Sequence, residues 1–196
     1  MNLIQNRAFL SKARVVFLDR DGVINEYPGD FQYVTEWKAF RFLPNVFEAL
    51  RRLSENAFKL FIISNQAGVS KGIYSYEALK SITENMLEEL SKQGVIISGV
   101  YYCIHQPEDN CNCRKPKTGL IDRAIERLKS ENLDIDLQHS YFVGDTIRDV
   151  ETGIAAGLNT ILVFSGKEKL ENRHNWQVQP DFTASNLSEA VDLILK

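Results

Sequence analysis

The sequence lacks any apolar run long enough to cross a membrane, and it lacks an apolar leader at its start. A membrane-spanning helix needs about 18 consecutive apolar residues, and no run in this chain approaches that length. Residues 1–14 show neither the apolar core nor the small-residue cleavage pattern of a secretory signal. We therefore expect a cytoplasmic protein that does not associate with membranes.

The chain also lacks an excess of basic residues. It has 23 Lys and Arg against 26 Asp and Glu, which gives a formal net charge of -3. This balance argues against nucleic-acid or anionic-membrane binding through bulk charge. The sequence contains no internal repeat and no low-complexity segment, and its 196 residues suit one globular domain. We expect residues 1–196 to form a single domain and the protein to be a monomer.

Cysteine is scarce, and all three cysteines lie between positions 103 and 113. In a cytosolic chain, clustered thiols with a histidine among them indicate a metal site rather than disulfides. The alternative is three incidental thiols beside a surface histidine. Because the four side chains complete a tetrahedral set and leave no position for water, we predict a structural zinc site. Its ligands are Cys103, His105, Cys111 and Cys113.

Short apolar runs alternate with amphipathic helical patterns along the chain. Strands are predicted at residues 15–18, 59–64, 99–103, 140–143 and 159–164. Helices are predicted at residues 45–56, 76–93, 119–132, 146–156 and 187–195. This alternation predicts an α/β fold, a Rossmann-like doubly wound parallel sheet with right-handed crossovers. Residues 167–180 are predicted to be a loop, and residues 1–13 a polar lead-in with at most one helical turn.

Two carboxylates follow the first predicted strand directly. Asp19 and Asp21 come after the apolar run 15–18, and Gly22 then lets the chain turn away. In doubly wound α/β domains, ligands bind at the carboxyl ends of the strands. Because one residue separates the two carboxylates, their side chains can take different roles. Taken alone, this stretch can also be a simple polar turn.

Polar motifs also follow the second and fourth predicted strands. Ser64 and Asn65, with the glycines and Lys71 after them, resemble a phosphate cradle but lack the Walker spacing. Asp145 and Asp149 bring further carboxylates to the same edge of the sheet. Clustered carboxylates repel one another unless a cation joins them, and these hard oxygen ligands suit magnesium. The alternatives are a helix N-cap for Asp145 and a contact with the helix dipole for Asp149.

A basic segment, residues 114–117, comes directly after the predicted zinc site. A solvated run of charge is the usual explanation for such a segment. Pro116 and the anchored loop limit its freedom, however, so Lys115 can reach a phosphoryl group and Arg114 can bind phosphate or carboxylate oxygens as a fork. The spacing leaves open which of these two side chains points inward.

Residues 26–43 form a long segment that is rich in aromatic residues and has no sustained helical period. Long loops in compact domains often serve as lids or binding elements. A connector that packs its aromatic residues on its own domain is the alternative. We expect this segment to contribute to the selection of substrate.

Four motifs at the predicted strand ends resemble those of haloacid dehalogenase-like phosphatases: Asp19-x-Asp21-Gly22, Ser64-Asn65, Lys115-Pro116 and Gly144-Asp145-x-x-x-Asp149. The set spans residues 15–157. The Cys-x-His and Cys-x-Cys-Arg-Lys-Pro segments resemble the zinc-containing branch of this family, which includes phosphatases of heptose bisphosphate and of histidinol phosphate. The resemblance implies the Rossmann-like fold without a large cap domain.

The resemblance also implies a reaction that proceeds through an aspartyl phosphate. Asp19 would be the nucleophile, and Asp21 would act as the general acid and then as the general base. Magnesium would be bound by the Asp19 side chain, the Asp21 carbonyl and Asp145. Ser64, the Asn65 amide and Lys115 would hold phosphoryl oxygens, and Lys71 and Arg114 would contact the rest of the substrate.

A phosphorylated sugar is the substrate that the resemblance favours. The leading expectation is hydrolysis of D-glycero-D-manno-heptose 1,7-bisphosphate to heptose 1-phosphate, with histidinol phosphate as the alternative substrate. A nucleic-acid 3'-phosphatase is disfavoured because the chain lacks an extended basic face. An alternative of another class is a non-catalytic, zinc-stabilised binding module.

Overall fold

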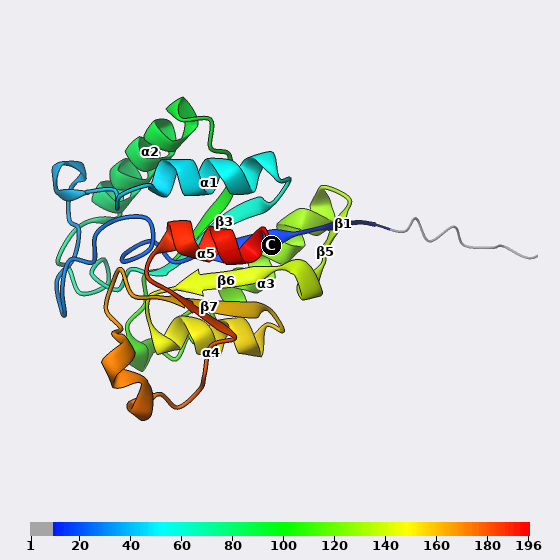
Figure 1. The fold of residues 1–196 in the computed structure, drawn as a ribbon. Coiled ribbons are helices and arrows are strands. Elements are labelled where there is room, and N and C mark those ends of the chain that lie inside the picture. The colour runs from blue at the N-terminus through cyan, green and yellow to red at the C-terminus, as the bar shows by residue number, and fades with distance from the viewer. Residues whose placement is uncertain (1–9) are drawn as a thin grey trace, which may run out of the picture.

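The computed structural model describes residues 10–196, and a six-stranded parallel sheet lies at its centre (Figure 1). The order of strands across the sheet is β4-β3-β2-β6-β7-β8. Their bounds are Val15–Leu18 for β2, Lys59–Asn65 for β3, Ile97–Cys103 for β4, Tyr141–Gly144 for β6, Asn159–Val163 for β7 and Phe182–Ala184 for β8. Every pairing in this sheet is parallel, so all six strands end at the same edge.

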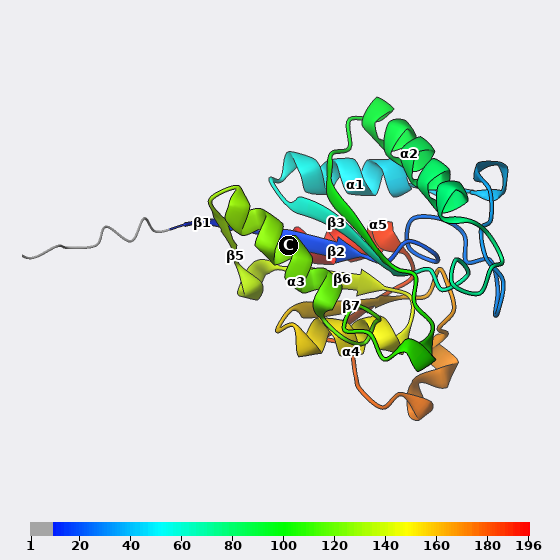
Figure 2. The same cartoon turned by 180° about the vertical axis from the view of Figure 1, so that it is seen from behind.

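Helices cover both faces of the sheet, as Figures 1 and 2 show from opposite sides. One face carries α1 (Val46–Glu55), α2 (Tyr76–Lys92) and α5 (Leu187–Ile194), and the other carries α3 (Gly119–Ser130) and α4 (Ile147–Ala155). Side chains of β2 alternate between the two faces. Val16 and Leu18 pack with the first group of helices, and Val15 and Phe17 pack with α3. Burial on both faces explains why this strand is apolar throughout and confirms the predicted doubly wound α/β fold.

Local signals in the sequence set the ends of the helices. The hydroxyl of Ser75 accepts a hydrogen bond of 3.1 Å from the Ala78 amide and so caps α2. Gly157, with φ of +72°, follows the end of α4. The predicted helices, and the predicted strands that correspond to β2, β3, β4, β6 and β7, differ from the observed bounds by at most two residues.

Three short strands were not predicted: β1 (Ser11–Ala13), β5 (Leu133–Ile135) and β8. β1 pairs with β5 in a separate two-stranded parallel sheet. Each strand has three residues, too few to show a period, and each depends on a partner that is distant in the sequence. The helical turn considered for residues 1–13 is wrong for Ser11–Ala13, and residues 1–9 lie outside the described part of the chain.

Irregular segments are partly ordered into single turns. The 3-10 helices are η1 (Trp37–Ala39), η2 (Pro107–Asp109), η3 (Leu137–His139) and η4 (Leu170–Asn175). The prediction of a loop throughout residues 167–180 is therefore wrong, because η4 lies within it. Among residues 10–196, no helix combines the length and the apolar character that a membrane crossing requires.

The two halves of the segment 26–43 lie in different surroundings. In its second half, Phe40 and Phe42 pack against each other with ring centroids 5.0 Å apart, and Phe42 lies 4.5 Å from the ring of Phe47 on α1. This half is a connector that packs on its own core. The first half, residues 27–33, instead lines a pocket at the edge where the strands end. Within residues 10–196, no separate helical unit is inserted above that edge.

Candidate active site

Strand register brings the predicted motifs together. Leu18 of β2 lies beside Ile62 of β3 and Val143 of β6, so the residues that follow these positions meet at one edge of the sheet. They line a pocket of about 370 Å³. This pocket contains every site residue predicted outside the zinc cluster, namely Asp19, Asp21, Ser64, Asn65, Lys71, Arg114, Lys115 and Asp145.

Lys115 points inward, which answers the question that its spacing left open. Its side chain is 3% exposed, and its ammonium group lies 2.9 Å from Asp19 Oδ2 and 2.6 Å from Asp149 Oδ1. It also donates a 3.0 Å hydrogen bond to the Ile63 carbonyl. Burial alone would lower the pKa of Lys115, but the charges of the two carboxylates outweigh burial and raise it. The lysine is therefore a fixed positive charge beside Asp19.

Asn65 holds the backbone of that lysine. Its side-chain oxygen accepts a hydrogen bond of 3.1 Å from the Lys115 amide, and its nitrogen donates one of 3.3 Å to the Lys115 carbonyl. The Asn65 side chain is thus committed to the protein. Any contact of Asn65 with a ligand falls to its backbone amide, the group named in the sequence-based prediction.

Three carboxylates gather beside Lys115. Oxygens of Asp19, Asp145 and Asp149 all lie within 4.8 Å of one another. Burial raises the pKa of Asp19 to about 6, opposed by Lys115 and reinforced by Asp149. Burial, followed by the charges of Asp19 and Asp149, raises the pKa of Asp145 well above its ordinary value. A divalent cation would offset this repulsion, and a set of carboxylate oxygens fits magnesium.

Asp149 was left without an assigned role by the sequence, and the structure gives it two sets of contacts. One oxygen accepts hydrogen bonds from the Thr146 amide (3.0 Å) and hydroxyl (2.6 Å) at the start of α4. The other oxygen lies beside Lys115. The helix-start alternative is thus correct, and the same side chain also belongs to the charged group at the pocket.

Two glycines enclose the carboxylate of Asp145. A Cβ at Gly166 would lie 2.6 Å from Asp145 Cγ, and one at Gly22 would lie 2.5 Å from the same atom. Gly22 also has φ of +81°, which L side chains rarely adopt. The amide of Lys167 donates a 2.8 Å hydrogen bond to Asp145 Oδ2. The carboxylate is therefore held between two backbone segments with no room for a further side chain.

Asp21 belongs to a different group of side chains. Its carboxylate accepts hydrogen bonds from Arg20, Asn25 and Gln66. Burial alone would raise the pKa of Asp21, but the charge of Arg20 and the hydrogen bonds from Asn25, Gln66 and Arg20 together outweigh burial and lower the pKa. Arg20 is fully buried. Neither Arg20 nor Gln66 was predicted, because an arginine and a glutamine at strand ends look like solvated turn residues.

The predicted zinc ligands converge. Cys103 Sγ lies 3.6 Å from Cys111 Sγ and 3.7 Å from His105 Nδ1, and Cys113 Sγ lies 3.4 Å from Cys111 Sγ and 3.2 Å from His105 Nδ1. Zinc–sulfur bonds of about 2.3 Å in a tetrahedron place two sulfur atoms about 3.8 Å apart. The spacing of these four atoms fits a closed tetrahedral zinc site.

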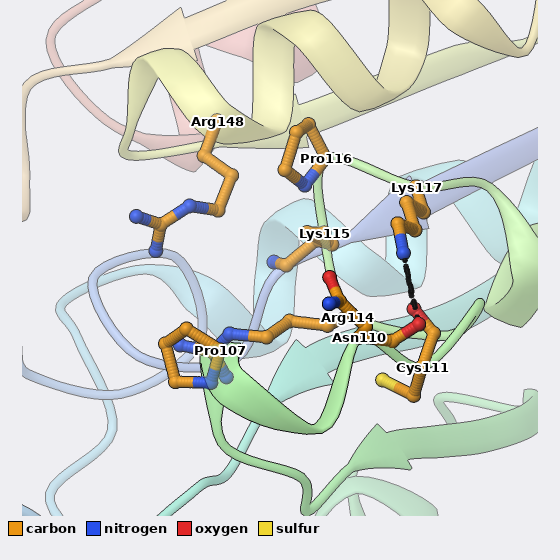
Figure 3. Close-up of a pocket in the computed structure, with 8 residues that line it drawn as sticks. All are labelled: Pro107, Asn110, Cys111, Arg114, Lys115, Pro116, Lys117 and Arg148. Carbon is orange, nitrogen blue, oxygen red and sulfur yellow. Dashed lines mark hydrogen bonds between the residues drawn. The ribbon is translucent and has the colours of Figure 1, made fainter.

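A second cavity, of about 290 Å³, adjoins the pocket and is lined by four cationic side chains and no carboxylate (Figure 3). Lys117 donates to the carbonyls of Asn110 (3.1 Å) and Cys111 (2.8 Å). The guanidinium groups of Arg114 and Arg148 extend on either side of Lys115, toward the end of the cavity where Pro107 lies.

Both arginines also line the main pocket, so the two cavities share a basic border. Arg114 donates a 3.1 Å hydrogen bond to the His105 carbonyl, which links it to the Cys/His cluster. The side chain of Arg148 makes no hydrogen bond or ion pair within residues 10–196. Arg148 was not predicted, and an arginine in the first turn of a helix carries no signal that separates it from surface residues.

Two lysines hold the loop 27–33 over the pocket. The ammonium of Lys71 lies 3.2 Å from Tyr33 Oη, and Lys167 forms an ion pair with Asp30. The tip of the loop presents Phe31, which is 90% exposed and lines the pocket. The loop therefore lies where it would contact a ligand, and its contribution to substrate selection stays a prediction.

The chain is similar to known proteins of one family. Residues 112–190 match the family model described as HAD-hydrolase-like. The chain is 38% identical over 161 residues to D-glycero-beta-D-manno-heptose-1,7-bisphosphate 7-phosphatase of Haemophilus influenzae, covering 79% of this chain and 83% of that protein. It is 34% identical over 158 residues to the alpha-anomer enzyme of Campylobacter jejuni, D-glycero-alpha-D-manno-heptose-1,7-bisphosphate 7-phosphatase, covering 81% and 86%.

A solved structure is similar along nearly the whole chain. The D,D-heptose 1,7-bisphosphate phosphatase of B. bronchiseptica, complexed with magnesium and phosphate, superposes with a TM-score of 0.83 at 26% identity. The match covers 93% of this chain and 98% of the other. A protein with a similar fold is thus known in complex with magnesium and phosphate.

Proposed function

Because this chain belongs to the family of haloacid dehalogenase-like phosphatases, and is thus a phosphoric monoester hydrolase, we propose that its substrate is D-glycero-D-manno-heptose 1,7-bisphosphate. The 7-phosphate would be released and heptose 1-phosphate would remain. The observation that carries this proposal is the buried Lys115 between Asp19 and Asp149, next to Asp145, in a pocket with a basic border. Relatives of known activity on this substrate support it.

The first step is transfer of the phosphoryl group to Asp19. An oxygen of Asp19 attacks phosphorus while the bond from phosphorus to the sugar oxygen breaks. The departing oxygen takes a proton from Asp21, which acts as general acid. Lys115, Ser64 and the Asn65 amide hold the other phosphoryl oxygens and stabilise their negative charge.

The second step is hydrolysis of the aspartyl phosphate. Asp21, now ionised, takes a proton from a water molecule as that water attacks phosphorus. The bond between phosphorus and the Asp19 oxygen breaks, which releases inorganic phosphate and restores the carboxylate. The network of donors around Asp21 favours the ionised form that this step requires, whereas the first step requires the protonated form.

Asp19, Asp145 and the carbonyl of Asp21 are the groups that would hold magnesium, with Asp149 close enough to orient them. When bound, magnesium supplies charge neutralisation at the phosphoryl oxygens and alignment of the attacking group. The similar solved structure that contains magnesium and phosphate supports magnesium as the cofactor.

Zinc is proposed as a structural ion held by Cys103, His105, Cys111 and Cys113. Through the hydrogen bond from Arg114 to the His105 carbonyl, it would fix the basic segment that begins at residue 114. A closed site with four protein ligands leaves no position for substrate. Its role would therefore lie in folding and in the placement of Arg114.

The second phosphate of the substrate meets the basic border of the pocket. Arg114 offers a fork for phosphate oxygens, and Arg148 offers a guanidinium that no side chain of residues 10–196 neutralises. Lys71, held near Tyr33, is a further cation at the mouth. Four cationic side chains in the adjoining cavity would not favour the ammonium group of histidinol phosphate. A bisphosphate is the better electrostatic match.

The proposed compartment is the cytoplasm, and the proposed assembly is a monomer. None of the three cysteines, all within the described residues, forms a disulfide, as is usual in a reducing compartment. Light scattering of the purified protein at two concentrations would test the monomer, with a mass near 22.4 kDa expected.

A panel of substrates tests the proposed function. Phosphate release should be fastest with heptose 1,7-bisphosphate, compared between its α and β anomers, and slower with histidinol phosphate and 3'-phosphorylated DNA. It should require magnesium and be abolished by Asp19→Asn, whereas Asp122→Asn, on the exposed side of α3, should leave it unchanged. Equal and weak release from all substrates would refute the assignment of substrate. Near-normal turnover by Asp19→Asn would refute the nucleophile.

A further inference from the structure

The carboxylate of Asp21 is held from three sides. Arg20 Nη2 lies 2.9 Å from both of its oxygens, and Asn25 Nδ2 donates to Oδ1 at 2.8 Å. Gln66 Nε2 donates to Oδ2, also at 2.8 Å. The side chain nevertheless remains 20% exposed and lines the pocket. It is thus fixed in orientation while one part still faces the ligand.

Gln66 differs from the other two donors because it connects Asp21 to a second pocket residue. The same nitrogen that bonds Asp21 lies 3.2 Å from the hydroxyl oxygen of Ser64. Gln66 is 1% exposed, and its backbone amide donates a 2.7 Å hydrogen bond to the Cys103 carbonyl at the end of β4. A buried residue with its backbone anchored in this way has little freedom to move.

Tyr74 decides which way the amide of Gln66 faces. Its hydroxyl donates a 2.6 Å hydrogen bond to Gln66 Oε1. Burial raises the pKa of Tyr74, so the hydroxyl keeps its proton and can donate. An ionised carboxylate at Asp21 can only accept hydrogen bonds. A flipped amide would place an oxygen against that carboxylate, so only one orientation satisfies both neighbours.

We propose that Gln66, oriented by Tyr74, is a positioning residue that fixes the position of the Asp21 carboxylate relative to the Ser64 hydroxyl. Neither Gln66 nor Tyr74 lines the pocket, so each acts through Asp21 and Ser64. The inference rests on the proposed function, in which Asp21 transfers protons and Ser64 holds the phosphoryl group. If Gln66 plays this role, the carboxylate that transfers protons and the hydroxyl that binds the phosphoryl group stay at a fixed distance from each other.

Substrates with different leaving groups distinguish a loss of positioning from general damage to the site. A sugar alkoxide needs a proton from Asp21 to depart, whereas p-nitrophenolate departs without one. Water attack on the aspartyl phosphate needs Asp21 with either substrate. Loss of positioning should therefore slow both steps with heptose bisphosphate, but only the second step with p-nitrophenyl phosphate.

The experiment compares Gln66→Leu with the wild-type protein in rapid mixing and in steady state, in the presence of magnesium. With heptose 1,7-bisphosphate, kcat should fall about 100-fold, the effect expected for a catalytic group misplaced by about 1 Å, while KM changes less than about 3-fold. With p-nitrophenyl phosphate, the variant should release about one equivalent of p-nitrophenolate in a burst, followed by slow turnover, because aspartyl phosphate accumulates.

Tyr74→Phe provides a milder variant that keeps the buried ring. Loss of one buried hydrogen bond should lower kcat about 5-fold with the same burst. Gln93→Leu and Tyr76→Phe are matched controls at exposed positions on and beside α2, and they should behave as wild type.

The outcomes separate this inference from the proposed function. Absence of phosphatase activity in the wild-type protein would overturn the proposed function itself. An active wild type, with both steps of p-nitrophenyl phosphate hydrolysis slowed equally in Gln66→Leu and in Tyr74→Phe and no burst in either, would overturn the positioning role alone. If Gln66→Leu does not fold, the burst and rate of Tyr74→Phe decide the question.

Discussion

Gly166 offers a direct test of the proposed magnesium site, because its missing side chain makes room for a metal ligand. A Cβ at position 166 would lie 2.6 Å from Asp145 Cγ and 2.7 Å from Asp145 Cβ, whereas ordinary contacts begin at 3.4 Å. Asp145 Oδ2 would lie closer still, so Gly166→Ala requires a separation of at least about 0.8 Å between the loop and the carboxylate. The backbone at Gly166 lies outside the left-handed region, so alanine adds steric conflict without backbone strain.

Neither partner has an easy way to retreat. The loop is held because the amides of Lys167 and Glu168 donate hydrogen bonds to Asp145 Oδ2 (2.8 Å) and to the Asp145 carbonyl (3.0 Å). On its other side the carboxylate faces Gly22 at close approach. A shift of about 0.8 Å is several times the roughly 0.2 Å tolerance of metal–ligand distances. We expect magnesium affinity to fall about 10- to 100-fold, or about 1.4 to 2.7 kcal/mol.

The assay is phosphate release from heptose 1,7-bisphosphate as a function of magnesium concentration, together with thermal unfolding with and without magnesium. Gly166→Ala should raise the magnesium midpoint by the stated factor and reduce the stabilisation that magnesium gives. Gly94→Ala is the control. An added Cβ there meets nothing within 4 Å, so its φ of +76° costs about 1–2 kcal/mol of stability without affecting the metal. A folded Gly166→Ala protein with a midpoint within 3-fold of wild type would refute the reasoning.

Three further predictions follow from other parts of the site. Arg148→Ala should raise KM for heptose 1,7-bisphosphate about 10-fold or more, since a charge-assisted hydrogen bond contributes about 1.5–3 kcal/mol, and should leave KM for a monophosphate unchanged. The control is Arg127→Ala at an exposed position. Equal changes in KM for both substrates would contradict the role of Arg148. Cys111→Ser should lower the zinc content from about one equivalent per chain and reduce thermal stability, and metal analysis that finds no zinc in the folded wild-type protein would contradict the site. The metal-free protein should lose stability as pH rises from 4 to 7, because Asp19 keeps its proton up to a pKa of about 6 when folded and only to about 3.8 when unfolded. Asp19 accounts for at most about 3 kcal/mol of this loss in the free energy of unfolding, and magnesium should reduce the loss. Chemical unfolding at several pH values measures it, and a stability that rose with pH over this range would contradict the prediction.

Much of the fold could be predicted because its signals are local. The buried strand 15–18 is recognisable from four apolar residues, and the cap at Ser75 from its position before an amphipathic helix. The three-residue strands could not be predicted, because their pairing partners are distant in the sequence. Ser11 lies beside Leu133, and without that neighbour its segment has no feature of a strand.

The residues of the candidate site likewise fall into those that local motifs predict and those that only packing reveals. Asp19, Lys115 and Asp145 could be proposed from motifs at strand ends, because a parallel sheet brings those ends to one edge. Arg20 and Gln66 escaped notice, because polarity alone indicates solvent exposure for both. Only packing shows that each is buried and hydrogen-bonded to Asp21.

The sequence by itself determined the alternation of strands and helices that makes a doubly wound fold, the clustering of the four zinc-type ligands, and the family to which the four motifs belong. These follow from patterns between residues close along the chain and from the fixed geometry of parallel sheets. Tertiary structure alone decided that Lys115, and not Arg114, lies buried between the carboxylates, that Arg148 joins the basic border, and that Gln66 connects Asp21 to Ser64. The physical reason is that burial and hydrogen-bond partners depend on atoms from several distant segments, and the identity of a residue does not specify them.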